Sequence, residues 1–294
     1  MQNIDVRKIR ARKFSLRRIT FGKVIFYLIM TGLACFMALP LVYLVVTAFK
    51  PLDELFLFPP RFFVKNPTLQ NFTDLMATLD SNTVPFTRYL FNSTLVTVVS
   101  VFGSVVTCTM AAFVAEKLKP RGLQAFSRIV TYALMFSAPA AQIPIYLIVS
   151  NLGMINTYWS LIIPKIAVPM YFFLYQQFVS QIPNELIESA RIDGCGNMKL
   201  FIRIIVPLTK AAISTIVVFA FVANWNDSFS PMIYIQKQAM KTLPIILSTI
   251  GTGGVARAGA GAAAVFLTTL PTIGLYVAMQ TRVLTTMAYS GIKG

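Results

Sequence analysis

The stretch Asn184–Pro207 reads NELIESARIDGCGNMKLFIRIIVP and lies between two long apolar segments. Its charged side chains stand beside apolar residues that recur at helical spacing; these charges are Glu185, Glu188, Arg191, Asp193, Lys199 and Arg203. Apolar residues that recur every three or four positions indicate an amphipathic helix. Because charged side chains are costly in hydrocarbon, we expect this segment to lie outside the bilayer and to present a face to a soluble partner.

The composition of the whole chain is that of an integral membrane protein. Of its 294 residues, 56% are hydrophobic and only 12% are charged, whereas about a quarter of the residues in soluble domains are charged. The net charge of +16 is therefore expected to reflect Lys and Arg held in cytoplasmic loops, not nucleic-acid binding. Histidine is absent and Cys35, Cys108 and Cys195 are scattered, so neither a metal site nor a catalytic site is predicted.

Hydropathy predicts an all-α membrane protein with six transmembrane helices. A helix needs about 20 apolar residues to span a bilayer, and the predicted spans are 24–49, 89–115, 129–149, 157–180, 208–234 and 258–281. The basic arm 1–23 and the basic loop 116–128 indicate that both termini are cytoplasmic. The predicted organisation is thus an N-terminal arm (1–23), a transmembrane domain (24–286) that contains the charged loop 182–207, and a cytoplasmic tail (287–294).

The charged loop itself predicts two short helices around a corner. Asn184 is a candidate cap for the first helix, and Gly194-Cys195-Gly196 is expected to end it because glycine tolerates a positive φ. Asn197 is a candidate cap for a second helix over 198–206, which Pro207 limits. Together the two helices would form a compact knob on the membrane surface.

At these residues the chain resembles the permease subunits of bacterial ABC importers. Their hallmark loop reads Glu-Ala-Ala, three residues, Gly, nine residues, then Ile-x-Leu-Pro. The same spacing is met here by Glu188, Ser189, Ala190, Gly194, Ile204 and Pro207. Ser189 stands for Ala and Val206 for Leu, changes that keep size and packing character. Over nearly the whole chain the similarity is to the carbohydrate-uptake branch, the maltose-type second permease of binding-protein-dependent systems; further similar stretches are 47–50, 67–72, 92–93, 225–227 and 242–244.

The resemblance implies an ABC type I importer fold in the bacterial cytoplasmic (inner) membrane. Residues 188–194 would belong to a coupling helix that docks on a separate ATPase subunit. The implied partners are a second permease subunit in a heterodimer, two copies of an ABC ATPase, an extracytoplasmic solute-binding protein, an oligosaccharide and the lipid bilayer. The alternative for this helix is an amphipathic anchor lying in lipid headgroups, although such anchors usually carry a strongly basic polar face.

Two residues inside the predicted spans are clearly charged, Lys165 and Asp227. Intramembrane ionisable groups are functional candidates by default. Either the two pair with each other, or Lys165 faces the translocation cavity and attracts an acidic sugar such as a uronate. Further candidates for contact with a sugar are Asn224, Trp225, Asn226, Tyr158 and Gln142. Prolines are expected to interrupt the third and fourth spans, at Pro139, Pro144, Pro164 and Pro169.

The source of energy separates the possible functions. The chain has no G-x-x-x-x-G-K-[ST] loop, the motif that cradles nucleotide phosphates, so ATP and Mg are expected on partner ATPase subunits and no cofactor on this chain. An ion-coupled secondary transporter is the alternative, but it needs intramembrane acids or histidines. A membrane-embedded enzyme would need a catalytic group set. Import driven by separate ATPase subunits is therefore the first hypothesis.

Overall fold

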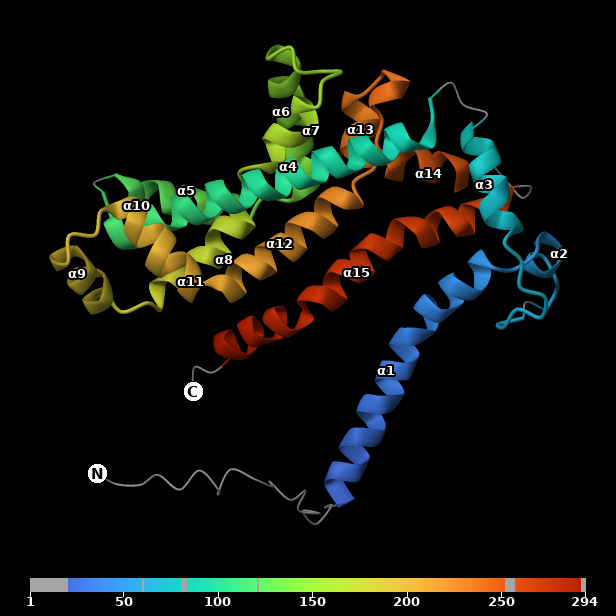
Figure 1. Cartoon of the computed structure of the whole chain (residues 1–294), viewed down its shortest axis with the longest axis horizontal. Coiled ribbons are helices and arrows are strands. Elements are labelled where there is room, and N and C mark those ends of the chain that lie inside the picture. Colours follow the sequence, from blue (N-terminus) through green and yellow to red (C-terminus); the bar gives the residue numbers. More distant parts are fainter. Residues whose placement is uncertain (1–20, 60, 81–83, 121, 252–256, 292–294) are drawn as a thin grey trace.

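The computed structural model describes residues 21–59, 61–80, 84–120, 122–251 and 257–291. Within these ranges every regular element is a helix (Figure 1), which confirms the predicted all-α class. Most of the predicted basic arm, residues 1–20, and the end of the predicted tail, residues 292–294, lie outside the described residues. The domain boundaries therefore stay predictions.

The central helix of the bundle is α4 (Phe86–Phe113), which continues into the π-helical turn η2 (Val114–Leu118). α8 (Pro169–Ser180) and α12 (Lys210–Trp225) pack along it, and α14 (Leu243–Gly251) packs near its start (Figure 1). Most buried side chains of α4 are small or carry a hydroxyl, amide or thiol; they include Asn92, Ser93, Thr97, Ser100, Ser104, Cys108 and Ala112. Small residues allow helices in membranes to approach closely.

The long helix α15 (Ala258–Gly291) covers the other side of α12 and also contacts α14 and α3 (Gln70–Asp80). α1 (Phe21–Ala48) diverges from the bundle and meets it near its C-terminal end (Figure 1). There Phe49 contacts the rings of Phe72 and Phe266 at centroid distances of 5.2 and 5.9 Å. Residues 21–43 of α1 are exposed and almost entirely apolar, so this surface needs lipid or another subunit to cover it.

Three helices in the described residues are long and apolar enough to cross a membrane: α1, α4 with η2, and α15 over Ala258–Gln280. A fourth candidate, Asn197–Leu208 followed by α12, is bent by 81°. The predicted fifth span continues past α12 into α13 (Phe229–Tyr234) after a break at 226–228. The six-span topology therefore stays a prediction, because the remaining predicted spans are not single helices.

The third and fourth predicted spans are each divided. The third consists of α5 (Leu123–Ala133) and α6 (Ala138–Asn151), and the fourth of α7 (Trp159–Ile162), the 3-10 turn η3 (Ile163–Lys165) and α8. Pro139 and Pro169 stand in the first turns of α6 and α8, where proline is favoured, so interruption at these two is confirmed. The expectation for Pro144 is wrong, because it lies inside α6 without ending it. Pro164 lies within η3, at the end of the α7 segment.

Side chains of α4 bind the backbone carbonyls that the break before α8 leaves outside a helix. The hydroxyl of Ser104 donates to the carbonyl of Lys165 at 2.7 Å, and the thiol of Cys108 lies 3.7 Å from the carbonyl of Ile166. Backbone polar groups inside a membrane need protein partners because water is absent. These residues of α4 therefore make the break in the fourth span tolerable.

The end of α4 near Phe86, called its outer end below because the predicted topology puts it outside, holds the segment that enters α14. The amide of Asn92 donates to the carbonyls of Ala239 and Lys241 at 2.9 and 2.8 Å, and the hydroxyl of Ser93 accepts a hydrogen bond from Leu243 N at 2.7 Å. Asn92 and Ser93 are both buried. α4 thus provides polar partners for irregular backbone at its outer end as well as in its middle.

The outer ends of α1, α3 and α15 meet at Asn71. Its amide donates to the carbonyls of Ala48 and Lys50 at 3.0 and 2.7 Å, which leaves its side chain no freedom to move aside. Gly259, in the first turn of α15, lies directly against it: a Cβ added there would stand 2.1 Å from Asn71 Oδ1. A glycine is therefore required for this close approach.

Replacing Gly259 by Ala should lower the stability of the outer assembly by about 1–3 kcal/mol, because the new methyl group overpacks a fixed side chain. Thermal unfolding of the purified protein in detergent measures the effect. Gly274→Ala is the matched control in the same helix, because nothing lies within 4 Å of its Cβ position and alanine has the higher helix propensity. Equal melting temperatures for the two variants would contradict the packing argument.

A second set of hydrogen bonds in the outer loop depends on the ionisation of Glu54. Glu54, in the short helix α2 (Leu52–Leu55), accepts hydrogen bonds from the backbone N–H groups of Lys65 and Asn66 at 3.0 and 3.1 Å. The hydrogen bond from Lys65 contributes most to lowering the pKa of Glu54 below its ordinary value of 4.5. A carboxylate with a lowered pKa in the folded state stabilises that state above the ordinary value, and this contribution is lost as pH falls through the folded-state pKa.

The outer loop should therefore become more susceptible to proteolysis below about pH 4.5. Limited proteolysis with an acid-active protease between pH 3 and 7, referenced to a denatured substrate of the same protease, should show this change. Glu54→Gln should make the loop susceptible already at neutral pH and flatten the profile. Asp53→Asn, at a neighbouring exposed carboxylate with no hydrogen bond seen in the described residues, should retain the wild-type profile; an identical flattening there would refute the role of Glu54.

Candidate functional site

The charged loop forms the predicted knob. Its first helix is α9 (Asn184–Ile192), and its second helical segment runs through α10 (Asn197–Leu200), the π-helical turn η4 (Phe201–Ile205) and α11 (Val206–Leu208). Gly194 has φ +77°, Cys195 N donates to Ala190 O at 2.9 Å and Gly194 N donates to Arg191 O at 3.0 Å. This is the Schellman pattern of helix termination. It confirms the predicted corner at Gly194.

Three details of the knob differ from the sequence predictions. Asn184 and Asn197 are not caps but the first residues of their helices, after Pro183 and Gly196, and neither helix has a side-chain cap. The second helical segment does not stop at Pro207 but includes it and ends at Leu208. The bend comes at Thr209, whose hydroxyl is bonded to the hydroxyl of Tyr175 on α8 at 2.7 Å.

One face of the knob packs against the opposite end of α4, at Phe113, called its inner end because the predicted topology puts it in the cytoplasm. Ile187 and Ala190 of α9 are buried together with Leu200 and Phe201, in the same cluster as Phe113 of α4. The rings of Phe113 and Phe201 are 5.3 Å apart. The knob is therefore seated on the bundle through a continuous apolar contact.

The opposite face of α9 is open. Glu188 and Ser189 are exposed, and the side chain of Ile192 is 87% exposed. Of the residues predicted to contact an ATPase, Ala190 lies inside the knob, Ile204 is half-buried, and Gly194 and Pro207 are exposed. Ala190 is thus part of the internal packing rather than of the outer face.

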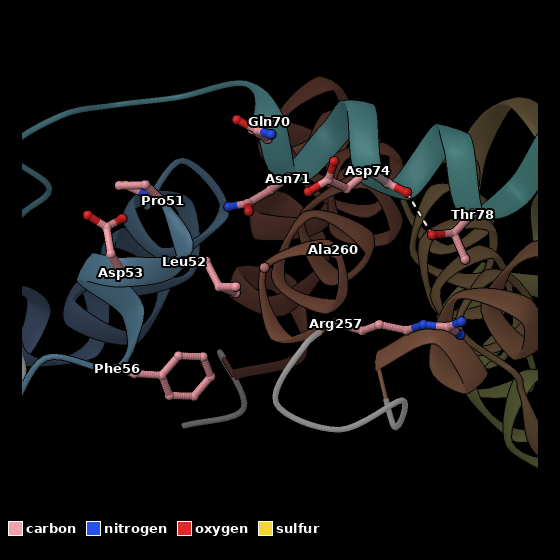
Figure 2. A pocket seen from close by; sticks show the side chains of 11 residues that line it. Pro51, Leu52, Asp53, Phe56, Gln70, Asn71, Asp74, Thr78, Arg257 and Ala260 are labelled. Carbon is pink, nitrogen blue, oxygen red and sulfur yellow. Dashed lines mark hydrogen bonds between the residues drawn. The ribbon is translucent and has the colours of Figure 1, made fainter.

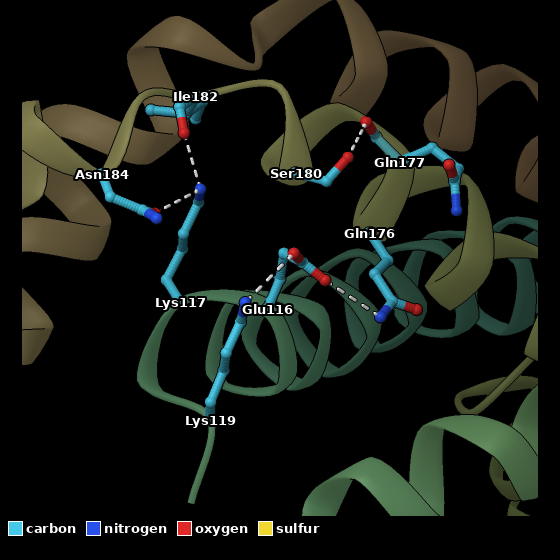
Figure 3. Close-up of polar contacts among 8 residues, drawn as sticks. All are labelled: Glu116, Lys117, Lys119, Gln176, Gln177, Ser180, Ile182 and Asn184. Atoms are coloured by element: carbon cyan, nitrogen blue, oxygen red, sulfur yellow. Dashed lines mark hydrogen bonds and ion pairs between the residues drawn. The ribbon is translucent and has the colours of Figure 1, made fainter.

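A polar cluster beneath the knob was not predicted (Figure 3). Lys117 of η2 donates to the carbonyl of Ile182 at 2.6 Å and to Oδ1 of Asn184 at 3.1 Å. Gln176 of α8 donates to Glu116 at 3.2 Å. The sequence showed Lys117 only as one basic residue of a cytoplasmic loop, and no local pattern indicated that it reaches residues so distant in the chain.

Lys165 and Asp227 form an ion pair, so the simpler of the two sequence hypotheses describes this conformation. Their side chains are 20% and 14% exposed. Asp227 also accepts hydrogen bonds from the backbone N–H groups of Phe229 and Ser230 at 3.0 and 3.1 Å, and so caps the start of α13. The pair connects the break between α7 and α8 with the break between α12 and α13.

The remaining candidates for sugar contact are not gathered into one site. Trp225 donates from Nε1 to Thr268 O at 2.9 Å, and the amide of Asn226 lies 3.3 Å from Thr272 Oγ1, so both face α15. Tyr158 donates to Asn92 Oδ1 at 2.7 Å, and Gln142 lies half-buried on α6.

Asn224 differs from these residues. Its amide nitrogen bonds to its own helix at Ala220 O (2.7 Å), but its buried Oδ1 has no hydrogen-bond partner in the described residues. A buried acceptor without a partner is uncommon in native proteins. Among the predicted sugar-contact candidates, Asn224 is therefore the one with a buried and unpaired polar atom in this conformation.

A cavity lies at the outer end of the protein, away from the predicted substrate residues. It has a volume of about 750 Å³ and is formed by α2, α3 and the start of α15. Figure 2 shows Asp53, Asp74 and Arg257 around it, with Phe56 at one side. No group of His, Cys, Asp or Glu able to hold a metal ion occurs in the part of the chain that the structure describes.

Comparison with known proteins gives a consistent family. Over 92% of this chain and 99% of the other, the structure matches the crystal structure of a bacterial ABC transporter involved in the import of the acidic polysaccharide alginate, with a TM-score of 0.76 at 18% identity. The polygalacturonan/rhamnogalacturonan transport system permease protein YtcP of Bacillus subtilis (strain 168) is 30% identical over 76% of this chain and 75% of its own.

The arabinooligosaccharides transport system permease protein AraQ of Halalkalibacterium halodurans is 26% identical over 87% of this chain and 91% of its own. Residues 103–285, which include α9 and the corner at Gly194, match the model of the binding-protein-dependent transport system inner membrane component. The chain belongs to this family of inner membrane components of binding-protein-dependent transport systems.

Proposed function

We propose that this chain is a transmembrane permease subunit of a binding-protein-dependent ABC importer of oligosaccharides, and that α9 is its coupling helix. The observation that carries the proposal is the geometry of the knob. α9 is terminated by a glycine corner, buries Ile187 and Ala190 in the apolar cluster through which the knob reaches Phe113 of α4, and is exposed on the other face at Glu188 and Ile192. A rigid helix with one seated and one open face suits transmission of force from a soluble partner.

In the proposed mechanism, separate ATPase subunits bind ATP and Mg, and their closure moves α9. The apolar side chain of Ile192 and the carboxylate of Glu188 would grip a cleft in the ATPase, since desolvated apolar contact supplies affinity and charge complementarity supplies orientation. Because the knob contacts the end of α4 through the rings of Phe201 and Phe113, its displacement would reach the helices around α4. The helices would then alternate between inward-facing and outward-facing arrangements.

The proposed assembly contains this chain, a second permease in a pseudo-symmetric heterodimer, two ATPase subunits and an extracytoplasmic solute-binding protein. The exposed apolar length of α1 supports a further membrane partner, because that surface is not covered within this chain. The family of binding-protein-dependent components supports the soluble receptor. We place both termini on the cytoplasmic side of the inner membrane.

For the substrate we propose an oligosaccharide with acidic sugars. The alginate importer and the polygalacturonan/rhamnogalacturonan permease support an acidic substrate, whereas the arabinooligosaccharide permease shows that relatives of similar identity are named for other sugars. In this chain, Lys165 supplies a cation inside the predicted spans. In the present conformation its charge is neutralised by Asp227, so an acidic substrate would have to compete with that carboxylate.

The alternative, an ion-coupled secondary transporter, has less support. Asp227 could bind a coupling ion only after losing Lys165, and it also caps α13. Uptake that persisted without the ATPase subunits and followed an ion gradient would favour this alternative.

The assignment of α9 predicts that Glu188→Arg lowers the amount of ATPase that copurifies with the permease complex by about tenfold, because it reverses a charge on the docking face. Glu188 is exposed, so the substitution should leave the fold intact. The measurement is the ratio of ATPase to permease after affinity purification from the native membrane.

Asp74→Arg is the matched control for this experiment. It makes the same charge change on an exposed acid of α3, at the outer end of the protein, and should leave ATPase recovery unchanged. If Glu188→Arg retains the ATPase as well as this control does, α9 is not the docking helix.

The charge-selection hypothesis predicts different losses for acidic and neutral sugars. Lys165→Met combined with Asp227→Asn removes both charges while keeping an oxygen that can cap α13, so no unpaired carboxylate remains. Uptake of oligogalacturonides should fall about tenfold through loss of a charge-assisted hydrogen bond, while uptake of arabinooligosaccharides should change less than twofold. Equal losses of both sugars would show that the pair is purely structural.

A further inference from the structure

The ammonium group of Lys117 joins the end of α4 to the turn that leads into α9 (Figure 3). Its acceptors, Ile182 O and Asn184 Oδ1, are 65 and 67 residues away along the chain. The ion pairs of the described residues do not include Lys117. Both of its observed hydrogen bonds therefore go to uncharged acceptors of the turn before α9.

These two acceptors fix the direction in which α9 begins. Ile182 O and Asn184 Oδ1 stand on either side of Pro183, whose φ of −58° and ψ of 140° lead directly into the helix. Hydrogen bonds from an ionised donor are about twice as strong as those between neutral groups. One ammonium that holds both sides of a proline thus orients the first turn of a helix that has no side-chain cap of its own.

The π-helical turn η2 places two consecutive side chains on two neighbouring elements. Glu116 accepts a hydrogen bond from Gln176 of α8 at 3.2 Å, whereas Lys117 reaches the turn before α9. The turn closes with Lys119 N donating to Val114 O at 3.1 Å, and Lys119 has φ +44°. Short π-helical turns are often found at functional sites. Here the turn makes the end of α4 a joint between α8 and α9.

We propose that Lys117 is a positioning residue for energy coupling: it holds the start of α9 to α4, so that both move as one unit when the ATPase moves α9. The proposal rests on the proposed function, because it takes α9 as the helix to which the ATPase binds. Without Lys117, the apolar seat at Ile187 and Ala190 would still retain the knob. The start of α9 would then be free to swing relative to α4, and part of the displacement would be lost in this joint.

The test measures this joint directly in the complete transporter complex. Nitroxide labels are placed at Glu185→Cys on α9 and Val98→Cys on α4, both at exposed positions, in a background without the native cysteines. Pulsed electron paramagnetic resonance gives the distance between the labels in the nucleotide-free complex and in the complex trapped with ADP and vanadate. With Lys117 present the distance should be the same in both states. With Lys117→Met, the distribution of label-to-label distances should be broader in the nucleotide-free state, and its mean should shift when the complex is trapped.

Two further variants separate positioning from general effects of charge. Lys117→Arg keeps a charged donor and should keep the wild-type distances. Lys119→Met removes the neighbouring exposed lysine, whose ion pair with Glu116 is long at 3.9 Å, and should also behave as wild type. ATPase recovery with Lys117→Met should stay within about twofold of wild type, because the docking face is untouched.

The proposal is overturned if Lys117→Met gives wild-type distances in both states, or if Lys119→Met gives the same broadening. Loss of the ATPase from the Lys117→Met complex would also overturn it, since the residue would then support docking or folding rather than transmission. Failure of the proposed function looks different: the ATPase would stay bound after Glu188→Arg, whatever the distances in the Lys117 variants.

Discussion

Backbone groups that leave a helix inside a bilayer must find partners within the protein, and the arrangement around α4 depends on this constraint. The break before α8 frees the carbonyls of Lys165 and Ile166, which are bound by Ser104 and Cys108. An isolated helix with such a break would be costly in lipid. The buried polar residues of α4, such as Ser104 and Cys108, therefore face the interrupted backbone before α8.

The same helix connects the two ends of the protein. At its outer end Asn92 and Ser93 hold the segment that enters α14, and at its inner end Phe113 and Lys117 hold the knob. Helices are stiff over this length compared with loops, so a displacement at one end is carried along the axis instead of being absorbed locally. Under the proposed function, a displacement of the knob would reach α4 through the contact of Phe201 with Phe113 and through Lys117.

The sequence predicts the knob well because its signals are local. The corner at Gly194 needs a positive φ, and the spacing from Glu188 to Pro207 is measured along the chain, so both can be read without tertiary structure. The predicted caps at Asn184 and Asn197 are wrong because the preceding residues, Pro183 and Gly196, occupy the N-cap positions. The ion pair of Lys165 with Asp227 was one of two open alternatives, since charge in a span indicates a partner without identifying it.

What the sequence could not show is non-local. Lys117 looks like an ordinary member of a basic loop until the fold brings it to Ile182, and the substrate candidates looked like one group until Tyr158 and Trp225 were seen to bond to different helices. Hydropathy also predicts unbroken helices where the backbone is interrupted, because it measures the length of an apolar segment and not its backbone geometry. Of the four prolines in these spans, Pro139 and Pro169 stand in the first turn of a new helix, whereas Pro144 lies inside one. The sequence alone does not show where each helix begins.

Lys165 and Lys117, both partly buried, have their charges stabilised in opposite ways. Lys165 neutralises Asp227, and that carboxylate caps the N–H groups at the start of α13. Lys117 binds a backbone carbonyl and an amide oxygen at the start of α9, with no carboxylate between them. The first arrangement spreads a buried charge over an ion pair and a helix start, whereas the second leaves the ammonium bound only to dipoles. A charge bound to dipoles is held less strongly than one bound to an opposite charge in a low dielectric. Removal of the ammonium from the joint beneath α9 leaves no carboxylate unpaired, whereas removal of Lys165 would leave Asp227 as an unpaired, partly buried charge.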